Sequence, residues 1–323
     1  MTLKQRIGAF VASALAAGAV AVPAASAAPA PGTPTLIGAS SRDWTWFDRA
    51  VGPQQVYRGF DGGFNYSTWS QVPYKLAHNS SGQMNDYSFR IPPAALARGD
   101  YDARLTTFIA STPKTINLTN IHEPEQETEA GQFTFSAYRK AIARLNTLTD
   151  AVNAKDGGTR TVSVILMIST FRGFKGRNPE NFWPTVAKGD GGTADIQAAD
   201  VYASVHATGT VGTPEGYTDG VNWVEPTVIF NPLIAFAKAH STDWVVSELG
   251  YLEYKGQPNR KGDALKTAVA VATAGGGYRP ALWVCYFDNS GGRADWQLRH
   301  SQPPIPSTSD TSYATRVWDS LTP

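Results

Sequence analysis

Two glutamates stand where apolar, strand-like runs give way to proline or glycine. Glu123 follows a run that ends at Ile121 and precedes Pro124, and Glu248 closes a run that is followed by Gly250. The carboxyl ends of parallel barrel strands meet at one rim, so both side chains can face a shared groove. Two carboxyl groups placed in this way can divide the cleavage of a glycosidic bond between a general acid/base and a nucleophile. We assign Glu123 to the first role and Glu248 to the second.

Each assignment has an alternative. Glu123 and the acids that follow it, Glu125, Glu127 and Glu129, also fit the first turn of a helix, where the helix dipole favours negative charge. Glu125 is the rival for the acid/base role, although the Glu-Pro order favours Glu123. Glu248 has the alternative role of an ion-paired structural residue.

Eight apolar or β-branched runs have the length of strands and are bounded by turn residues. They cover residues 35–39, 55–60, 74–78, 115–121, 161–168, 199–205, 244–247 and 280–287. Helical periodicity lies between several of them, most clearly at 133–154, from Asn231-Pro232 onward, and at 263–274 before a triple glycine. Alternating strands and helices indicate a parallel sheet covered by helices. We predict the α/β class and a single (β/α)₈ TIM barrel.

The expected strand ends carry many polar and aromatic side chains. The candidates for substrate binding are Arg58, His78, Asn79, His122, Tyr202, His206, Trp283 and Asp288. Aromatic faces stack on the C–H surfaces of sugar rings, while carboxylates, amides and guanidinium groups hydrogen-bond the hydroxyls. Arg58 has the alternative of a structural ion pair with Asp61, and single barrel histidines are more often structural than catalytic. Long loops at 171–192 and 208–226 are expected to shape the subsites.

With these residues, the chain resembles the clan A glycoside hydrolases. These are (β/α)₈ enzymes with an acid/base Glu after strand four and a nucleophile Glu after strand seven. His122-Glu123-Pro124 is similar to the Asn-Glu-Pro of cellulase-like members and to the His-Glu of mannanase-like members. Ser247-Glu248-Leu249-Gly250 is similar to their Ser-Glu-Phe-Gly. The resemblance implies that Trp283 is an aromatic platform and that Arg58 hydrogen-bonds the nucleophile. His122 replaces the commoner Asn, and the His-Glu-Met-Asn-Gly run of the mannanase-like family is missing, so the chain looks like a divergent branch.

The two roles predict a retaining mechanism through a covalent glycosyl-enzyme, with the carboxyl groups about 5–5.5 Å apart. The ionised Glu248 raises the pKa of the acid, and Arg58 keeps Glu248 ionised. Two alternatives stay open: a non-catalytic secreted carbohydrate-binding or cell-wall-associated barrel, and a transglycosylase that uses the same residues.

The first residues indicate a secretory signal peptide. Lys4 and Arg6 precede an Ala-rich apolar run of about sixteen residues, and the small residues Ala25-Ser26-Ala27 follow. The run is shorter than the ~20 residues of a membrane-spanning helix. We therefore expect a signal peptide at 1–27, a flexible mature N-terminus at 28–34, the glycoside hydrolase domain at 35–323, and a secreted protein without stable membrane insertion.

Composition limits the partners. The chain is 42% hydrophobic and 17% charged, which favours a packed core over disorder. A net charge of +1 and the lack of a basic run argue against nucleic acid and favour a neutral polysaccharide or oligosaccharide. Gln126 stands where the H-E-x-x-H zinc motif needs its second histidine, so we expect neither metal nor cofactor. The single Cys285 can form no intramolecular disulfide, and we expect a monomer.

Overall fold

The computed structural model describes residues 34–41, 44–73, 76, 83–169, 178–202, 217–218, 224–251, 253–254, 259–288, 290–291, 294–295, 298 and 313–322. The predicted signal peptide and all of the predicted N-terminal segment except Pro34 lie outside these residues. Among the helices of the described residues, none has the length and apolar character needed to cross a bilayer.

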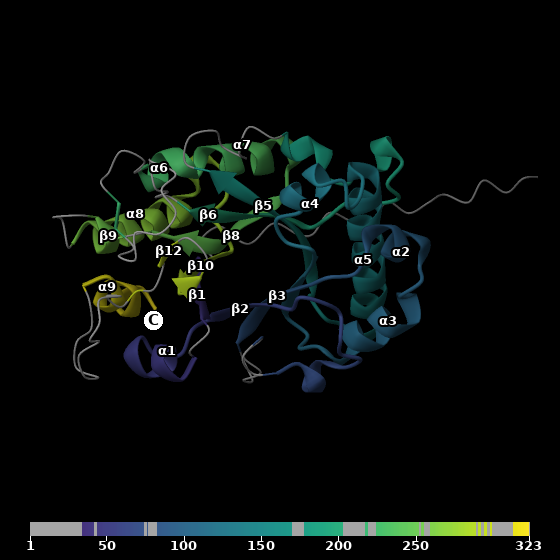
Figure 1. Cartoon of the computed structure of the whole chain (residues 1–323), viewed down its shortest axis with the longest axis horizontal. Helices are drawn as coiled ribbons and strands as arrows, with labels where there is room; N and C mark the ends of the chain where they lie inside the picture. Colours follow the sequence, from purple (N-terminus) through teal and green to yellow (C-terminus); the bar gives the residue numbers. More distant parts are fainter. Residues whose placement is uncertain are drawn as a thin grey trace, which may run out of the picture.

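Eight parallel strands close into a barrel at the centre of the molecule (Figure 1). Their spatial order is β1 (Leu36–Ser41), β10 (Trp283–Asp288), β8 (Asp243–Gly250), β6 (Ile196–Tyr202), β5 (Thr161–Ser169), β4 (Ile116–Asn120), β3 (Met84–Phe89) and β2 (Val56–Phe60), which pairs with β1. The closed parallel barrel confirms the predicted α/β class and (β/α)₈ architecture.

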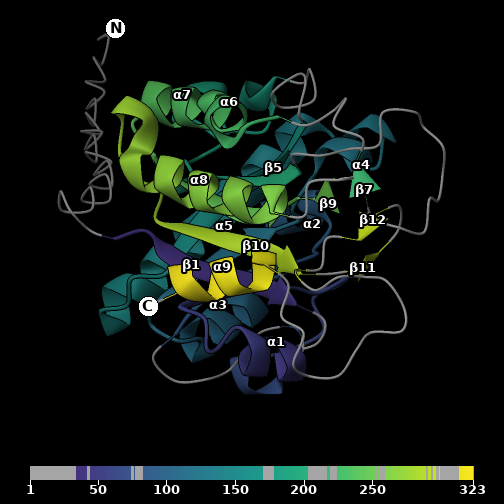
Figure 2. The ribbon, with the colours of Figure 1, turned by 90° about the vertical axis from the view of Figure 1, so that its left-hand side faces the viewer.

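Helices surround the barrel, with α2, α3 and α5 on one side of Figure 1 and α6, α7 and α8 on another. They are α1 (Trp44–Ala50), α2 (Pro93–Arg98), α3 (Asp102–Ser111), α4 (Glu125–Glu129), α5 (Phe135–Asp156), α6 (Pro226–Ile229), α7 (Asn231–His240), α8 (Arg260–Ala274) and α9 (Tyr313–Leu321). The C-terminal α9 packs beside α8 (Figure 2). Two small ladders follow barrel strands: β7 (Tyr217–Thr218) with β9 (Glu253–Tyr254), and β11 (Ser290–Gly291) with β12 (Ala294–Asp295).

Helix α5 shows how the predicted helices form. The Thr134 side chain accepts a hydrogen bond from the Ala137 N–H and so caps the first turn, and Gly157 ends the helix with a φ of 71°. Side chains at three- and four-residue spacing, among them Tyr138 and Ile142, are buried against the barrel. The periodicity predicted at 133–154 is thereby confirmed within two residues at each end.

The third predicted strand was wrong. The barrel strand is β3 (Met84–Phe89), and Leu76, the described residue of the predicted 74–78, lies in a turn. Asp86 and Ser88 of β3 face polar partners inside the barrel, so this strand has no continuous apolar run from which to recognise it. The sixth strand begins at Ile196, three residues before the predicted start.

An apolar cluster lies inside the barrel, toward the end where the strands begin. Val56, Ile165, Ile196, Ala198, Val245, Trp283 and Cys285 form this inner cluster. Gly38 of β1 belongs there because a Cβ at this position would lie 2.3 Å from the Val56 carbonyl oxygen and 2.8 Å from Cys285 Sγ. The larger apolar core lies between the strands and the helices.

No α-helix is found among the described residues between β5 and β6, where a regular barrel has one. The segment 178–192 contains the 3₁₀ turns η2 (Pro179–Asn181) and η3 (Val186–Lys188) instead. Phe182 packs edge-on against Tyr138 of α5 at 5.9 Å, and Trp183 packs against Phe236 of α7 at 5.7 Å. The described part of the loop expected to shape subsites therefore fills the space between α5 and α7. Residues 170–177 and 203–216 lie outside the described residues.

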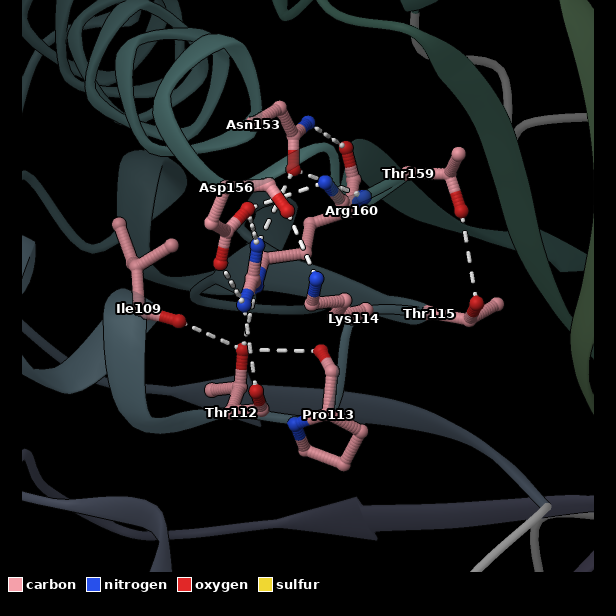
Figure 3. A network of polar contacts seen from close by, with 10 residues as sticks. Ile109, Thr112, Pro113, Lys114, Thr115, Asn153, Asp156, Thr159 and Arg160 are labelled. Carbon is pink, nitrogen blue, oxygen red and sulfur yellow. Dashed lines mark hydrogen bonds and ion pairs between the residues drawn. The ribbon is translucent and has the colours of Figure 1, made fainter.

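A polar network ties the helices to the end of the barrel where strands begin (Figure 3). Arg160, just before β5, donates to both carboxylate oxygens of Asp156 at the end of α5, at 2.9 Å each. Its Nε also donates to the Thr112 hydroxyl at 2.9 Å, and Lys114 Nζ donates to the Asp156 carbonyl at 2.7 Å. This end of a (β/α)₈ barrel serves stability, while the opposite end carries the loops that do chemistry.

Candidate active site

An extra residue in β8 turns Glu248 into the barrel. Between the pairs Ala199 with Val246 and Asp200 with Glu248, β8 advances two residues while β6 advances one. The pairing of β8 with β10 shows the same extra residue, and the bulged position is Ser247. Val245 belongs to the inner apolar cluster and Val246 to the outer core, so plain alternation would send Glu248 outward with Val246. The bulge reverses this direction.

Two groups hold the Glu248 carboxylate. The Tyr202 hydroxyl donates a hydrogen bond to Oε2 of Glu248, and Nη2 of Arg58 lies 3.6 Å from Oε1. Burial raises the pKa of Glu248 above its ordinary value, against the lowering effects of Arg58 and Tyr202. Burial and the nearby negative charges raise the pKa of Tyr202 well above its ordinary value, so its hydroxyl remains a donor. Arg58 therefore lies beside Glu248 as an ion pair, but neither Nη2 nor Oε1 has a hydrogen-bond partner among the described residues, so the predicted hydrogen bond is not formed.

Arg58 is anchored from the other side by Asp86. Arg58 Nε lies 3.8 Å from Asp86 Oδ2, and Nη1 donates to the Ser88 hydroxyl at 2.7 Å. Asp86 in turn accepts from Asn117 Nδ2 at 2.7 Å and from Trp283 Nε1 at 3.3 Å. The guanidinium therefore sits between two carboxylates in a fully buried position, and the alternative pair with Asp61 is not formed.

Asp200 faces Glu248 from the neighbouring strand β6. The two residues are register partners, and Asp200 is fully buried. Within the described part of the chain, neither carboxylate oxygen of Asp200 has a hydrogen-bond partner. Burial and the charge of Glu248 raise the pKa of Asp200 well above its ordinary value, while Arg58 lowers it. Because Glu248 has Tyr202 and Arg58 to stabilise its charge, we assign the proton to Asp200 and the charge to Glu248.

Glu123 lies in a strained turn at the end of β4. Ile121 and Glu123 both have positive φ angles, 59° and 52°. Such angles cost about 1–3 kcal/mol each in residues other than glycine and cluster at functional sites. The Glu123 N–H donates to the Ile165 carbonyl of β5 at 3.0 Å, and the side chain is half-buried. The turn thus directs Glu123 by backbone conformation.

Glu123 faces the same region as Glu248. Its charge raises the pKa of both Asp200 and Tyr202, the two residues that flank Glu248. The rival Glu125 is placed differently: its side chain is 1% exposed and its Oε1 accepts a hydrogen bond from the Met167 N–H of β5 at 2.7 Å. Of the two glutamates, only Glu123 combines partial exposure with a position near Glu248.

His122 lies beside the site as a neutral ring. Burial and the positive charges of Arg58 and Arg90 lower the pKa of His122 to about 3. The ring packs against Phe60 at 5.1 Å between centroids. No described residue provides a hydrogen-bond partner for its buried Nδ1. His122 can therefore bind a substrate hydroxyl, but it cannot exchange protons near neutral pH.

Two other predicted binding residues are placed where they make structural contacts. Trp283 begins β10, so it lies at the lower end of the strand, 1% exposed, and cannot serve as a platform at the rim. Asp288 ends β10, but it accepts from the Leu298 N–H at 2.8 Å and from the Ser41 hydroxyl at 3.2 Å, which holds a loop. His78, Asn79 and His206 lie outside the described residues.

Sequence reasoning assigned no role to three residues of the site. Asp86 and Asp200 are buried acids within strands, and Phe287 packs edge-on against Tyr202 at 5.7 Å near the end of β10. Polar residues at every second position of β3 were the available signal for Asp86. Among the described residues, no group of three His, Cys, Asp or Glu side chains is arranged to hold a metal ion.

Comparison by sequence gave no relative, because no family model and no curated protein matches the chain. Comparison of structures found several proteins with a similar fold. A β-glucosidase from the hyperthermophile Pyrococcus furiosus matches with a TM-score of 0.53 and 10% identity over 87% of this chain and 82% of that one. A modular endo-β-1,4-mannanase of glycoside hydrolase family 26 from Cellulomonas fimi matches with a TM-score of 0.53 and 12% identity over 89% and 70%. The catalytic domain of the Bacillus sp. JAMB-750 family 26 endo-β-1,4-mannanase matches with a TM-score of 0.50 and 13% identity over 90% and 86%. The chain therefore has the (β/α)₈-barrel fold of these glycosidases.

Proposed function

We propose that this protein is a retaining glycoside hydrolase in which Glu248 is the nucleophile and Glu123 the general acid/base. The observation that carries the proposal is the Glu248 carboxylate, which a β-bulge turns into the barrel and which Tyr202 and Arg58 hold from two sides. A nucleophile must be ionised and fixed in direction, and the two contacts serve both needs.

In the first step, an Oε atom of Glu248 attacks the anomeric carbon of the sugar. The bond from that carbon to the glycosidic oxygen breaks, and Glu123 donates its proton to the departing oxygen. The contacts of Arg58 and Tyr202 with Glu248 keep both carboxylate oxygens oriented while charge leaves them. The product of this step is a glycosyl ester of Glu248.

In the second step, the now ionised Glu123 takes a proton from a water molecule, and the water oxygen attacks the anomeric carbon. The ester bond breaks, Glu248 regains its charge, and two inversions leave the anomeric configuration retained. A sugar hydroxyl in place of water would give transglycosylation by the same residues.

We propose an uncharged, β-linked oligosaccharide or polysaccharide as the substrate. The net charge of +1 gives no strong attraction for acidic polymers, and structurally similar proteins include a β-glucosidase and endo-β-1,4-mannanases. We also propose export, on the basis of the apolar N-terminal run. Mass spectrometry of the protein recovered from the culture medium would give a mature N-terminus near residue 28 if this is correct.

The test is hydrolysis of a panel that contains β-1,4-mannan, β-1,4-glucan and aryl β-glucosides and β-mannosides. We expect wild type to release reducing sugar, and Glu123→Ala and Glu248→Ala to lose nearly all of this activity. Glu129→Ala removes an exposed carboxylate from α4 and serves as the matched control. NMR of the first product formed should show the anomer of the substrate.

The other outcomes are equally informative. An inverted product would contradict the nucleophile role of Glu248. Full activity in both glutamate variants would contradict the catalytic pair. Tight binding of one polymer by wild type without any release would favour the carbohydrate-binding barrel.

A further inference from the structure

The backbone that carries Glu123 departs from the strand in which it begins. The ladder between β4 and β5 pairs Asn117 with Thr161 and Leu118 with Val162. Beyond this point the chain turns through the positive φ angles of Ile121 and Glu123. A turn with this conformation persists only where its surroundings hold it, so the contacts around it decide where Glu123 points.

The Glu125 side chain pairs with β5 beyond the point where the β4 backbone stops doing so. On β5 the Ile165 carbonyl accepts from the Glu123 N–H at 3.0 Å, and the next inward-facing position, Met167, donates its N–H to Glu125 Oε1 at 2.7 Å. The side chain of Glu125 therefore continues a pairing that backbone atoms of β4 no longer provide. This contact is a hydrogen bond to a charged acceptor in a buried position, which makes it a strong one.

Tyr138 of α5 holds the turn from outside the barrel. Its hydroxyl donates to the Ile121 carbonyl at 3.2 Å, and the residue is fully buried. The ring is fixed between Phe133, stacked at 6.0 Å, and Phe182, edge-on at 5.9 Å. Glu125 lies close enough for its charge to raise the pKa of Tyr138, together with burial, well above the ordinary value, so the hydroxyl stays protonated.

We propose that Glu125 and Tyr138 are positioning residues that set the direction of Glu123 and thereby its ability to protonate the leaving group. The inference rests on the proposed function, because it assumes that Glu123 is the acid. Neither residue touches the reacting atoms. Both act through the backbone of the turn, one at each side of Glu123, and a displacement of about 1 Å at such a distance from the chemistry costs about 100-fold in rate.

The choice of leaving group distinguishes a loss of acid catalysis from a general loss of activity. A phenyl glycoside needs a proton from the acid when its bond breaks, whereas a 2,4-dinitrophenyl glycoside does not. kcat/KM reports the first step, up to release of the aryl group, whichever step limits kcat. We would measure it for both aryl groups on β-glucosides and β-mannosides, with wild type, Glu125→Ala, Glu125→Gln, Tyr138→Phe and the control Glu129→Ala.

We expect Glu125→Ala to lower kcat/KM about 100-fold for the phenyl glycoside and to change it little for the dinitrophenyl glycoside. Tyr138→Phe should show the same pattern with a smaller loss. Glu125→Gln keeps an oxygen that accepts from the Met167 N–H, so it should restore most of the activity that Glu125→Ala loses. Equal losses on both leaving groups, or no loss on either, would overturn the inference.

Two controls distinguish this inference from the proposed function. Glu123→Ala must itself show the leaving-group pattern; if it does not, Glu123 is not the acid and the proposed function fails. A crystal structure of Glu125→Gln and of Tyr138→Phe decides the inference without activity. We expect a shifted Glu123 carboxylate in Tyr138→Phe and an unshifted one in Glu125→Gln. An unmoved turn in Tyr138→Phe would refute the positioning role even if no glycoside is cleaved.

Discussion

Asp200 and Glu248 face each other as register partners on β6 and β8, and both carboxyl groups are buried inside the barrel. The guanidinium group of Arg58 lies near both of these carboxyl groups and near that of Asp86. Three ionised carboxylates around one cation would leave excess negative charge in a poorly solvated place. The tyrosine and arginine contacts of Glu248 resolve the competition, because they stabilise its charge and leave the proton on Asp200.

The first prediction follows from this proton. The folded-state pKa of Asp200 lies well above its unfolded value, so the folded protein binds more protons as soon as pH exceeds that unfolded value. Asp200 therefore contributes stability at low pH that is lost as pH rises toward the folded pKa. Asp200→Asn mimics the protonated acid and should remove this loss. Its melting temperature should fall less between pH 4 and pH 8 than that of wild type.

Asp319→Asn on α9 is the control, because this carboxylate is exposed. It should show the same pH dependence as wild type. A parallel shift of the Asp200→Asn melting curve at every pH would show that Asp200 carries charge in the folded protein, contrary to our assignment.

The second prediction concerns acid stability through His122. Burial, Arg58 and Arg90 lower its pKa to about 3, whereas an unfolded histidine titrates near 6.5. Between these values the unfolded chain binds more protons, so stability is lost as pH falls below about 6.5. At pH 5 this loss amounts to about 1–2 kcal/mol. His122→Gln cannot take up a proton and should lose less stability than wild type between pH 7 and pH 5, as measured by urea unfolding.

Substitution of His240 by Gln provides the comparison for His122, since His240 pairs with Glu180 at 2.6 Å on the outside of the barrel. His240→Gln leaves His122 and its surroundings unchanged and should not reproduce the effect of His122→Gln. Identical slopes for His122→Gln and wild type would mean that His122 takes up a proton in the folded protein as readily as in the unfolded chain.

The third prediction concerns Arg160, at the end of the barrel remote from the site. Arg160 joins Asp156 at the end of α5 to Thr112 after α3 (Figure 3). Arg160→Ala leaves the Thr112 hydroxyl, the Thr112 carbonyl and the Asp156 carboxylate without their arginine donor, so the melting temperature should fall. The kcat and KM of the folded enzyme should stay at wild-type values, because none of these groups lies near Glu123 or Glu248. Lower kcat at unchanged stability would contradict this division between the two ends.

The elements that were predicted correctly are those whose sequence follows a simple pattern of apolar residues. Continuous apolar runs such as 161–168 marked strands covered by helices on one side, and 3.6-residue periodicity marked α5. β3 escaped because Asp86 and Ser88 alternate with Tyr87 and Phe89, so its inward side serves the polar network rather than an apolar core. A strand of this kind is recognisable only once its partner Arg58 is known to lie inside the barrel.

The sequence predicted which residues form the site more reliably than it predicted where their side chains lie in the barrel. Glu123, Glu248, Arg58 and Tyr202 lie together, but Trp283 was assigned to the rim because the family resemblance implies an aromatic platform in the last strand, which was predicted to begin at 280 and begins at Trp283 itself. With the strand beginning at Trp283, the indole falls at the lower end and donates to Asp86. Strand boundaries are the least certain part of a sequence prediction, and in a barrel they decide which end a residue occupies.

The accommodation of Ser247 as a single bulged residue gives the fourth prediction. Deletion of Ser247 would place Glu248 directly after the outward-facing Val246, so plain alternation would still turn Glu248 inward, and a folded deletion variant should keep detectable glycosidase activity. Ser247→Ala keeps the bulge and should retain activity, since its hydroxyl has no hydrogen-bond partner among the described residues. Circular dichroism and gel filtration establish whether each variant is folded. A folded deletion variant without activity would show that Glu248 does not face the site once Ser247 is removed, and the proposed geometry of the bulge would be wrong.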